Sequence, residues 1–310
     1  MRIKSLVRIS EVEEIWRKIG SRDGFLSLPI PHPLSFQLGR SHHGKRCFAV
    51  VGFRQRVKVE SSRAISVRCD HEGQEKWVVT FSLEDDSLSE VFVKFCWDLI
   101  ECSRESNNPE AELLFQYKKW RRMFASLVGE GMSDQVQKGL LGELLYLREL
   151  IERIGQQRAV AAWQGPDGCD QDFVFETGWS EIKTVKTSAT DVSISSLQQL
   201  ERQDIGWLIV YFADKDNSDA VTSVSVKDVA MKIADLISDD MVHDLFECKL
   251  ARAGYVGGDI SYNKYHVEKR KVFGVNGRFP RICPENVPAA VSMAQYALSL
   301  PAIQQFEVED

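Results

Sequence analysis

The sequence predicts a mixed fold of the α+β or α/β class, with a β-rich N-terminal domain followed by a domain whose central mixed sheet is flanked by helices. In the first part of the chain, short β-rich segments alternate with polar turns, which is typical of antiparallel strands. In the second half, helical and extended patterns alternate, which favours helices packed on a sheet. The polar segment 103–109 is the best linker in the sequence. We therefore expect domains at residues 1–107 and 108–310, the first serving recognition or partner binding.

The elements of the first domain follow from local composition. Segments rich in β-branched and aromatic residues predict strands, and two apolar-periodic stretches predict helices. The expected strands are 46–53, 57–60, 64–68 and 77–81, and the expected helices are 88–103 and 110–124.

The elements of the second domain alternate in type. We expect helices at 133–154, 194–201, 226–236, 240–251 and 288–298, and strands at 172–175, 181–185, 206–212 and 262–274. The order favours a layered α/β arrangement.

The composition is that of a soluble globular protein, with 44% hydrophobic and 27% charged residues in 310. No long apolar stretch or signal peptide occurs, so a cytoplasmic location without a membrane span is the default expectation. The seven scattered cysteines indicate reduced thiols. The net charge of −6 argues against nucleic-acid binding through the whole surface, although a local basic groove remains open.

Glu143 falls within the apolar stripe of the helix expected at 133–154, where Leu140, Leu144 and Leu147 recur at helical spacing. An ionised carboxylate on an apolar face costs several kcal/mol unless it finds a cation, a metal or hydrogen bonds. Glu143 therefore needs a partner. The alternative is a glutamate at the rim of the stripe that bonds to a backbone amide or an arginine.

Asp172, Glu181 and Lys183 are expected to share one face of a hairpin. A two-residue turn at Thr177-Gly178 would set Asp172 opposite Lys183, and period-two alternation would turn Ile182 to the other face. We also expect Glu181 and Lys183 to face Glu143. A longer turn or a bulge would change the register.

Two neighbouring carboxylates attract a divalent cation, and Mg²⁺ prefers oxygen ligands. Such a metal can stabilise charge on a phosphate and activate the attacking water. Lys183 could orient that water or neutralise developing charge, and a nearby cation would lower the pKa of Lys183. The alternative is an exposed hairpin with a cross-strand Asp172–Lys183 ion pair.

The order of these residues resembles the PD-(D/E)XK nuclease superfamily, with its restriction-endonuclease-like core. More closely, the chain is similar to a bacterial uncharacterised family of PD-(D/E)XK proteins of about this length. The motifs that carry the resemblance are Gly139-Leu-Leu-Gly-Glu-Leu, Trp163-Gln-Gly-Pro, Asp172-Phe-Val-Phe, Glu181-Ile-Lys-Thr, Ser195-Ser-Leu-Gln-Gln-Leu and Phe279-Pro-Arg-Ile.

The resemblance implies a Mg²⁺ site, with Mn²⁺ as a substitute, formed by Asp172, Glu181 and the Ile182 carbonyl and completed by Glu143. It implies Lys183 as the catalytic lysine and Gln199 as a polar residue near the scissile phosphate. The proline of the superfamily name is not adjacent to Asp172, whereas Gly165-Pro166-Asp167 offers a literal Pro-Asp. Asp170 has the same strand parity as Asp172, so it stays open as the metal aspartate, although Asp172 is preferred because it directly enters the apolar Phe-Val-Phe strand.

The resemblance implies a metal-dependent DNA endonuclease in prokaryotic restriction or defence, beside a separate ATPase or methyltransferase. The chain itself has no P-loop, so it is not expected to be a P-loop ATPase. Cutting both strands would favour a homodimer. The alternative is an inactive nucleic-acid-binding or assembly subunit that retains the fold. The basic run Lys118-Lys-Trp-Arg-Arg122 either touches phosphates or forms a solvated helix face with Trp120 packed inward.

Overall fold

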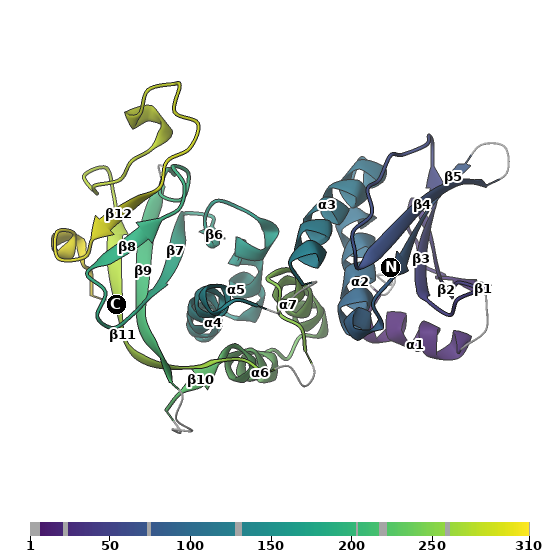
Figure 1. Cartoon of the computed structure of the whole chain (residues 1–310), viewed down its shortest axis with the longest axis horizontal. Coiled ribbons are helices and arrows are strands. Elements are labelled where there is room, and N and C mark those ends of the chain that lie inside the picture. The colour runs from purple at the N-terminus through teal and green to yellow at the C-terminus, as the bar shows by residue number, and fades with distance from the viewer. Residues whose placement is uncertain are drawn as a thin grey trace. The chain divides into compact units, whose positions relative to one another are not determined.

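The computed structural model describes residues 7–20, 24–72, 76–127, 132–202, 204–216, 222–257 and 261–309. This part of the chain forms seven α-helices, two five-stranded sheets and a two-stranded sheet (Figure 1). The mixed architecture and the β-rich N-terminal region confirm the predicted fold class. The compact units are Met1–Met132 with His243–Gly258, and Ser133–Val242 with Asp259–Asp310.

This division differs from the boundary expected near Asn107. The helix α3 (Pro109–Leu127) packs on α2 (Ser89–Arg104) inside the first unit, so residues 103–109 join two helices of one unit. The first unit also takes in α7 (Asp240–Arg252) from His243 onward. The polar segment 103–109 is therefore a connection between two helices and not a linker between units. The local sequence pattern could not distinguish the two, because the packing of α3 on α2 is a tertiary contact.

The first unit is built on an antiparallel sheet with the strand order β1-β2-β3-β5-β4. Its strands are β1 (Gly24–Ser27), β2 (Ser35–Arg40), β3 (Arg46–Phe53), β4 (Ile65–Glu72) and β5 (Lys76–Leu83). Phe48, Phe81 and Phe95 of α2 form a buried aromatic cluster between sheet and helices. The helix α1 (Ile9–Ile19) and the strands β1 and β2 were not expected, and the strand expected at 57–60 has no regular structure.

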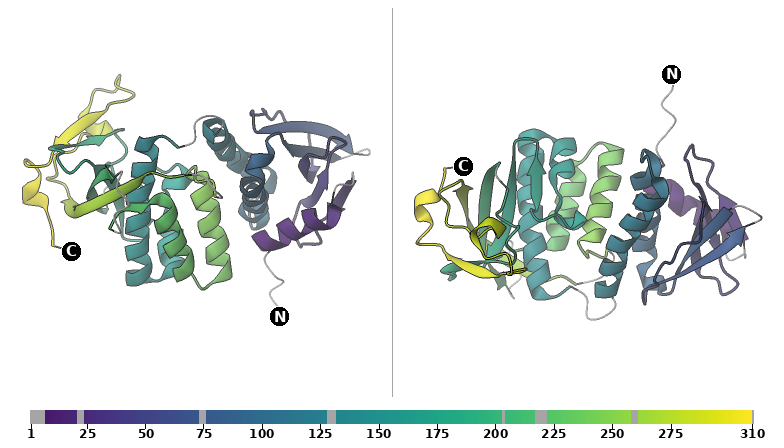
Figure 2. Two further views of the ribbon diagram at one scale, coloured as in Figure 1. Left: turned by 60° about the horizontal axis from the view of Figure 1, so that its bottom comes forward. Right: turned by 90° about the horizontal axis from the view of Figure 1, so that it is seen from above.

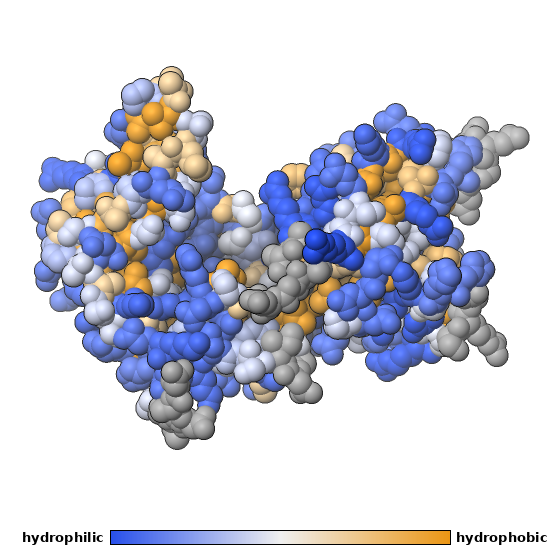
Figure 3. Space-filling view, in the orientation of Figure 1, coloured by the Kyte–Doolittle hydropathy of each residue, from blue (hydrophilic) through white to orange (hydrophobic). Residues whose placement is uncertain are grey.

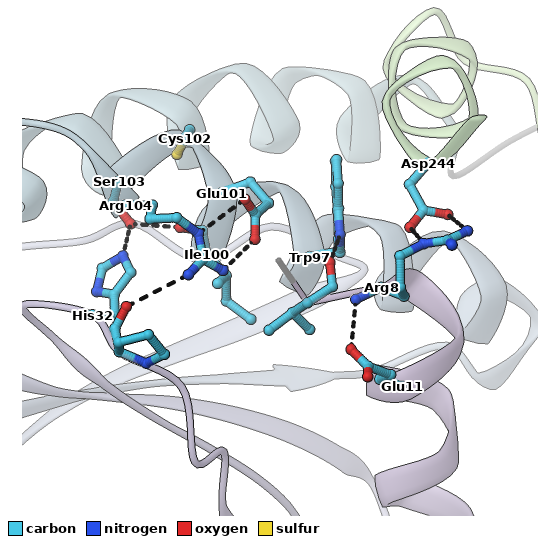
Figure 4. A network of polar contacts seen from close by, with 12 residues as sticks. Arg8, Glu11, His32, Trp97, Ile100, Glu101, Cys102, Ser103, Arg104 and Asp244 are labelled. Carbon is cyan, nitrogen blue, oxygen red and sulfur yellow. Dashed lines mark hydrogen bonds and ion pairs between the residues drawn. The ribbon is translucent and has the colours of Figure 1, made fainter. Parts of the chain in front are cut away.

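Polar contacts fasten α1 and α7 within the first unit (Figure 4). Arg8 Nε donates to Asp244 Oδ2 at 2.6 Å, and Trp97 Nε1 donates to the Val7 carbonyl at 2.7 Å. The side chain of Asp244 is almost fully buried. Because a buried carboxylate needs such partners, this ion pair ties a helix late in the sequence to the start of the chain.

The second unit contains a mixed sheet with the order β10-β11-β9-β7-β6. Only the β7–β9 pair is parallel among these described strands. The strands are β6 (Phe173–Phe175), β7 (Gly178–Val185), β9 (Ile205–Asp216), β10 (Val224–Ser225) and β11 (Lys264–Val275). The helices are α4 (Asp134–Ile154), α5 (Gln156–Ala162) and α6 (Val226–Leu236), of which α4 packs against the other two (Figure 2).

The two faces of this sheet have different partners. Helix α4 covers the face that carries Ser180, Ile182 and Thr184, because a side chain at Gly142 would collide with Thr184. The opposite face packs against β8 (Asp191–Ile194) and β12 (Tyr296–Ser299). Its buried core comprises Trp179, Val192, Ile194, Leu200, Leu208, Val210, Phe212, Phe273, Val275, Phe279, Leu298, Leu300 and Ile303.

Two predicted helices of the second unit are wrong. Residues 191–194 form β8, and residues 195–201 are irregular chain, bends and turns. Residues 288–295 have no regular structure, and Tyr296–Ser299 is β12. The two strands pair with each other across about a third of the chain. All seven cysteines are free, as expected. Within the described residues, no helix is both long and apolar enough to cross a membrane.

Candidate active site at the open edge of strand β7

The candidate residues gather where β6 ends and leaves the edge of β7 uncovered. Phe175 pairs with Gly178 and Phe173 with Ser180, so the turn is Glu176-Thr177. Among the described strands, β7 has no partner on this side beyond Ser180. This register differs by two residues from the expected one, a shift that leaves the side chains of β7 on their predicted faces. Asp172 precedes β6 and is not paired with β7 as a strand residue.

Asp172 takes the place of the missing strand at this edge. Its Oδ2 accepts a hydrogen bond from the backbone N–H of Ile182 at 2.8 Å. Its own carbonyl accepts from the N–H groups of Gln164 and Gly165 at 2.7 and 3.0 Å. Asp172 is thus held by backbone contacts on both sides. Asp170, the alternative metal aspartate, lies exposed in the preceding loop.

Glu181 and Lys183 lie on the face of β7 opposite to α4. Lys183 Nζ donates to Glu181 Oε1 at 2.7 Å and to Gln199 Oε1 at 3.3 Å. Gln199 lies in a turn instead of the expected helix, and its Oε1 also accepts from the N–H of Ser195 at 2.7 Å. Glu181 is 1% exposed, yet its Oε2 has no hydrogen-bond partner among the described residues. A buried acceptor of this kind is uncommon.

Glu143 reaches the same edge from α4. The indole Nε1 of the buried Trp163 donates to Glu143 Oε2 at 2.7 Å. A Cβ atom at Gly165 would lie 2.8 Å from Glu143 Oε2 and 3.2 Å from Asp172 Oδ1. The two carboxylates therefore converge above Gly165, where only a glycine leaves room for both.

The expected orientation of the site needs one correction. Helix α4 covers the Ile182 face of β7, so Glu181 and Lys183 do not point toward the helix that carries Glu143. Glu143 instead approaches beside Asp172 at the open edge. Ile182 is buried behind the site, as expected.

The carboxylates carry more negative charge than their surroundings balance. Burial and then repulsion from Asp172 raise the pKa of Glu143 to about 8, against the Trp163 hydrogen bond and Lys183. The same two causes raise the pKa of Glu181 well above its usual range, against the attraction of Lys183. Burial raises the pKa of Asp172, opposed by Lys183 and the Ile182 N–H.

Lys183 responds in the opposite sense. Burial alone would lower its pKa, but the charges of Glu181 and Asp172 outweigh burial and raise it. Lys183 is therefore held as a cation in a site where three carboxylates share it. These mutual interactions place Glu143, Asp172, Glu181 and Lys183 in one electrostatic cluster.

The donors that could hold a metal are few. No three His, Cys, Asp or Glu side chains within the described ranges are arranged so that they could bind a metal ion by themselves. A cation would have to use Asp172 and Glu181, the Ile182 carbonyl and water. The unpartnered Glu181 Oε2 and the oxygen-only donor set fit a hard divalent cation such as Mg²⁺.

Sequence reasoning missed the parts played by Trp163 and Gly165. A buried indole N–H usually finds a hydrogen-bond partner, so Trp163 in the Trp-Gln-Gly-Pro motif was a candidate for the partner that Glu143 needs. The space at Gly165 depends on two side chains from distant segments, and no local signal announces it.

Comparison with models of known protein families identifies a match. A model of the family described as "Putative PD-(D/E)XK family member, (DUF4420)" matches residues 12–301. No curated protein and no solved structure matches the chain. The matched residues include all those that meet at the edge of β7.

Proposed function

The chain belongs to this PD-(D/E)XK family, and from that premise we propose that it is a metal-dependent endonuclease that hydrolyses phosphodiester bonds of DNA. The observation that carries the proposal is the convergence of three carboxylates and one lysine at the open edge of β7, where one buried carboxylate oxygen has no hydrogen-bond partner in the part of the chain that the structure describes. Hydrolytic sites of this superfamily need such acidic and basic groups together.

Asp172 and Glu181 would hold the metal, with the Ile182 carbonyl as a further ligand and Glu143 completing the acidic cluster. When bound, a divalent cation supplies charge stabilisation at the phosphate and lowers the pKa of a bound water. Asp172 keeps the position of its carboxylate through the Ile182 N–H. Glu181 keeps its position through Lys183, which leaves its second oxygen available.

Lys183 acts as a hydrogen-bond donor and a positive charge. Because Glu181 and Asp172 raise its pKa, it stays protonated, orients the attacking water and balances the charge that develops on the phosphate. Gln199 fixes the lysine from the other side. The water oxygen bonds to phosphorus as the bond to the departing oxygen breaks, without a covalent enzyme intermediate.

The rival function is a nucleic-acid-binding or assembly subunit with an inactive nuclease fold. It is favoured by the Glu181–Lys183 ion pair and the Glu143–Trp163 hydrogen bond, which satisfy part of the cluster without any metal. Against it stands Glu181 Oε2, because an unpartnered buried acceptor costs free energy that a purely structural cluster would not need to bear. We therefore prefer the nuclease.

A plasmid-cleavage assay with Mg²⁺, with Mn²⁺ and with a chelator tests the proposal. The wild type should cleave only with metal, and Lys183→Ala should cleave at least ~100-fold more slowly, as for the loss of a charge-stabilising donor. Lys186→Ala is the matched control, because Lys186 is an exposed lysine just beyond the end of β7. It should cleave like the wild type.

Two outcomes would contradict the proposal. Cleavage that survives Lys183→Ala would remove this lysine from the mechanism. An absence of metal-dependent cleavage of plasmid and of single-stranded DNA, in a protein that still binds DNA, would establish the rival.

A further inference from the structure

The first unit carries a groove along the edge strand of its sheet. After β3 the chain runs back beside β4 without forming a strand. The groove between them encloses about 500 Å³. It is lined by Arg56, Val57, Lys58, Val59, Val67, Arg68 and Cys69. We call this feature the basic groove.

The charges of the basic groove have one sign. Arg56, Lys58 and Arg68 are exposed, and within the described chain none of them forms an ion pair with an acidic residue. Of the described residues, none that lines the groove is acidic. The chain has a net charge of −6, so these three neighbouring cations form a positive patch on a protein that is negative as a whole.

The last turns of α3 extend this positive surface. Arg121 forms an ion pair with Glu60, the residue after the groove segment, and Tyr117 donates to the Glu60 carbonyl at 2.7 Å. Arg121, Lys58 and Lys118 together lower the pKa of Glu60. The basic run of α3 therefore lies beside the groove, and its Trp120 is fully buried. Figure 3 shows hydrophilic residues over much of α3 and β4, with apolar residues among them.

We propose that the basic groove, with Lys118 beside it, binds the phosphate backbone of the DNA that the second unit cuts. Phosphate contacts draw on exposed Arg and Lys side chains, and they require no base-specific groups. A local positive groove also explains how a chain with a negative net charge can bind the negatively charged backbone of a nucleic acid. The inference rests on the proposed function for the identity of its ligand.

Fluorescence anisotropy with a labelled DNA duplex and a labelled single strand tests this binding directly. The full chain is used in the presence of a chelator, so that binding is measured without cleavage. The test variant is Arg56→Ala/Lys58→Ala/Arg68→Ala. The control is Arg17→Ala/Lys18→Ala/Lys76→Ala, which removes three exposed cations from the same unit and changes the net charge equally.

The groove variant should bind DNA at least ~10-fold more weakly than the control variant, as expected for three exposed charge contacts. For the duplex, the slope of log affinity against log salt concentration should fall by about 2.7, since each phosphate contact contributes about 0.9. Equal melting temperatures of the two variants would show that folding is intact.

The outcomes separate this inference from the proposed function. Loss of binding in the groove variant, in a protein that never cleaves, would support the groove and refute the nuclease. Metal-dependent cleavage with equal DNA binding by both variants would support the nuclease and refute the groove. Binding of labelled polyglutamate but of neither DNA form would assign the groove to an acidic protein and overturn the proposal.

Discussion

Asp98 in the first unit and Glu181 in the second are both buried carboxylates, but they differ in how many donors surround them. Asp98 Oδ2 accepts from Gln116 Nε2 and Trp120 Nε1, both at 2.6 Å, and from Arg252 Nη1 at 3.1 Å. One carboxylate thus has three donors, of which one is a cation.

At the edge of β7 the carboxylates outnumber the cations. Glu143, Asp172 and Glu181 share a single cation, Lys183, and one oxygen of Glu181 has no partner in the described chain. A cluster in which donors outnumber the carboxylate they surround needs no further cation, whereas a cluster short of positive charge is stabilised by a ligand that brings it. This contrast indicates that the cluster at the edge of β7, and not the Asp98 cluster, binds a positively charged ligand.

Asp98→Ala should have the largest effect on stability. It leaves the buried Arg252 without its carboxylate, which costs about 3–5 kcal/mol for a buried pair. Urea denaturation should show this loss in the unfolding of the first unit, and Glu105→Ala, an exposed acid at the end of α2, should change stability by less than about 0.5 kcal/mol. A cost near zero for Asp98→Ala would mean that the Asp98 cluster is not a structural one.

Mg²⁺ should stabilise the second unit, because the cation binds the folded site. At about 100 times the dissociation constant the gain is about 2.7 kcal/mol, measured as a shift of the urea midpoint. Glu181→Gln should remove this response, and in the absence of metal it should cost less stability than Asp98→Ala, since losing the Lys183 ion pair is offset by the loss of a crowded negative charge. Asp170→Asn is the control, and it should retain the full response.

If Asp170→Asn lost the Mg²⁺ response and Asp172→Asn kept it, the metal aspartate would be misassigned. If Glu181→Gln responded like the wild type, the cation would bind elsewhere and the contrast with Asp98 would lose its meaning.

Local patterns were enough to predict the helix that carries Glu143 and the face of β7 shared by Glu181 and Lys183. The helix prediction succeeds because its apolar stripe and its cap at Ser133 are written in consecutive residues. The predicted face is right although the predicted turn is wrong, because the register is shifted by two residues and side chains alternate along a strand with a period of two.

The predicted register of the hairpin was wrong because Gly178 does not form the turn with Thr177, as the prediction assumed. It lies in β7, where a Cβ would come within 2.6 Å of the Ile205 carbonyl and 2.8 Å of the Trp207 ring. This glycine permits close packing against β9 and is not part of the turn. The helix expected at 194–201 failed for a related reason, since β8 pairs with β12 far along the chain. Neither contact leaves a local signal.

Gly165→Ala should lower both stability and metal response. The new Cβ would contact Glu143 Oε2 and Asp172 Oδ1, and such overpacking costs about 1–3 kcal/mol. Gly139→Ala is the control, because nothing lies near its Cβ position on the exposed side of α4, and better helix propensity should raise stability by up to about 1 kcal/mol. A neutral Gly165→Ala with an intact Mg²⁺ response would show that the carboxylates do not converge there.

Tyr146→Phe should have the smallest effect, and it tests whether only one face of β7 is functional. Tyr146 OH and Ser180 Oγ are 3.1 Å apart on the face covered by α4, and both are buried. Losing this hydrogen bond costs about 1 kcal/mol, while the ring keeps its edge contact with Phe173. Thermal denaturation should show that loss, and Ser180→Ala should add little to it, because the two changes remove the same bond.

Plasmid cleavage by Tyr146→Phe should equal that of the wild type, because Glu181 and Lys183 lie on the opposite face of the strand. A fall in cleavage as large as that of Lys183→Ala, with the fold intact, would mean that the α4 face also contributes to the reaction. The edge of β7, with its shortage of positive charge, would then be only half of the site. The donor count that separates it from the Asp98 cluster would no longer suffice to recognise a functional cluster.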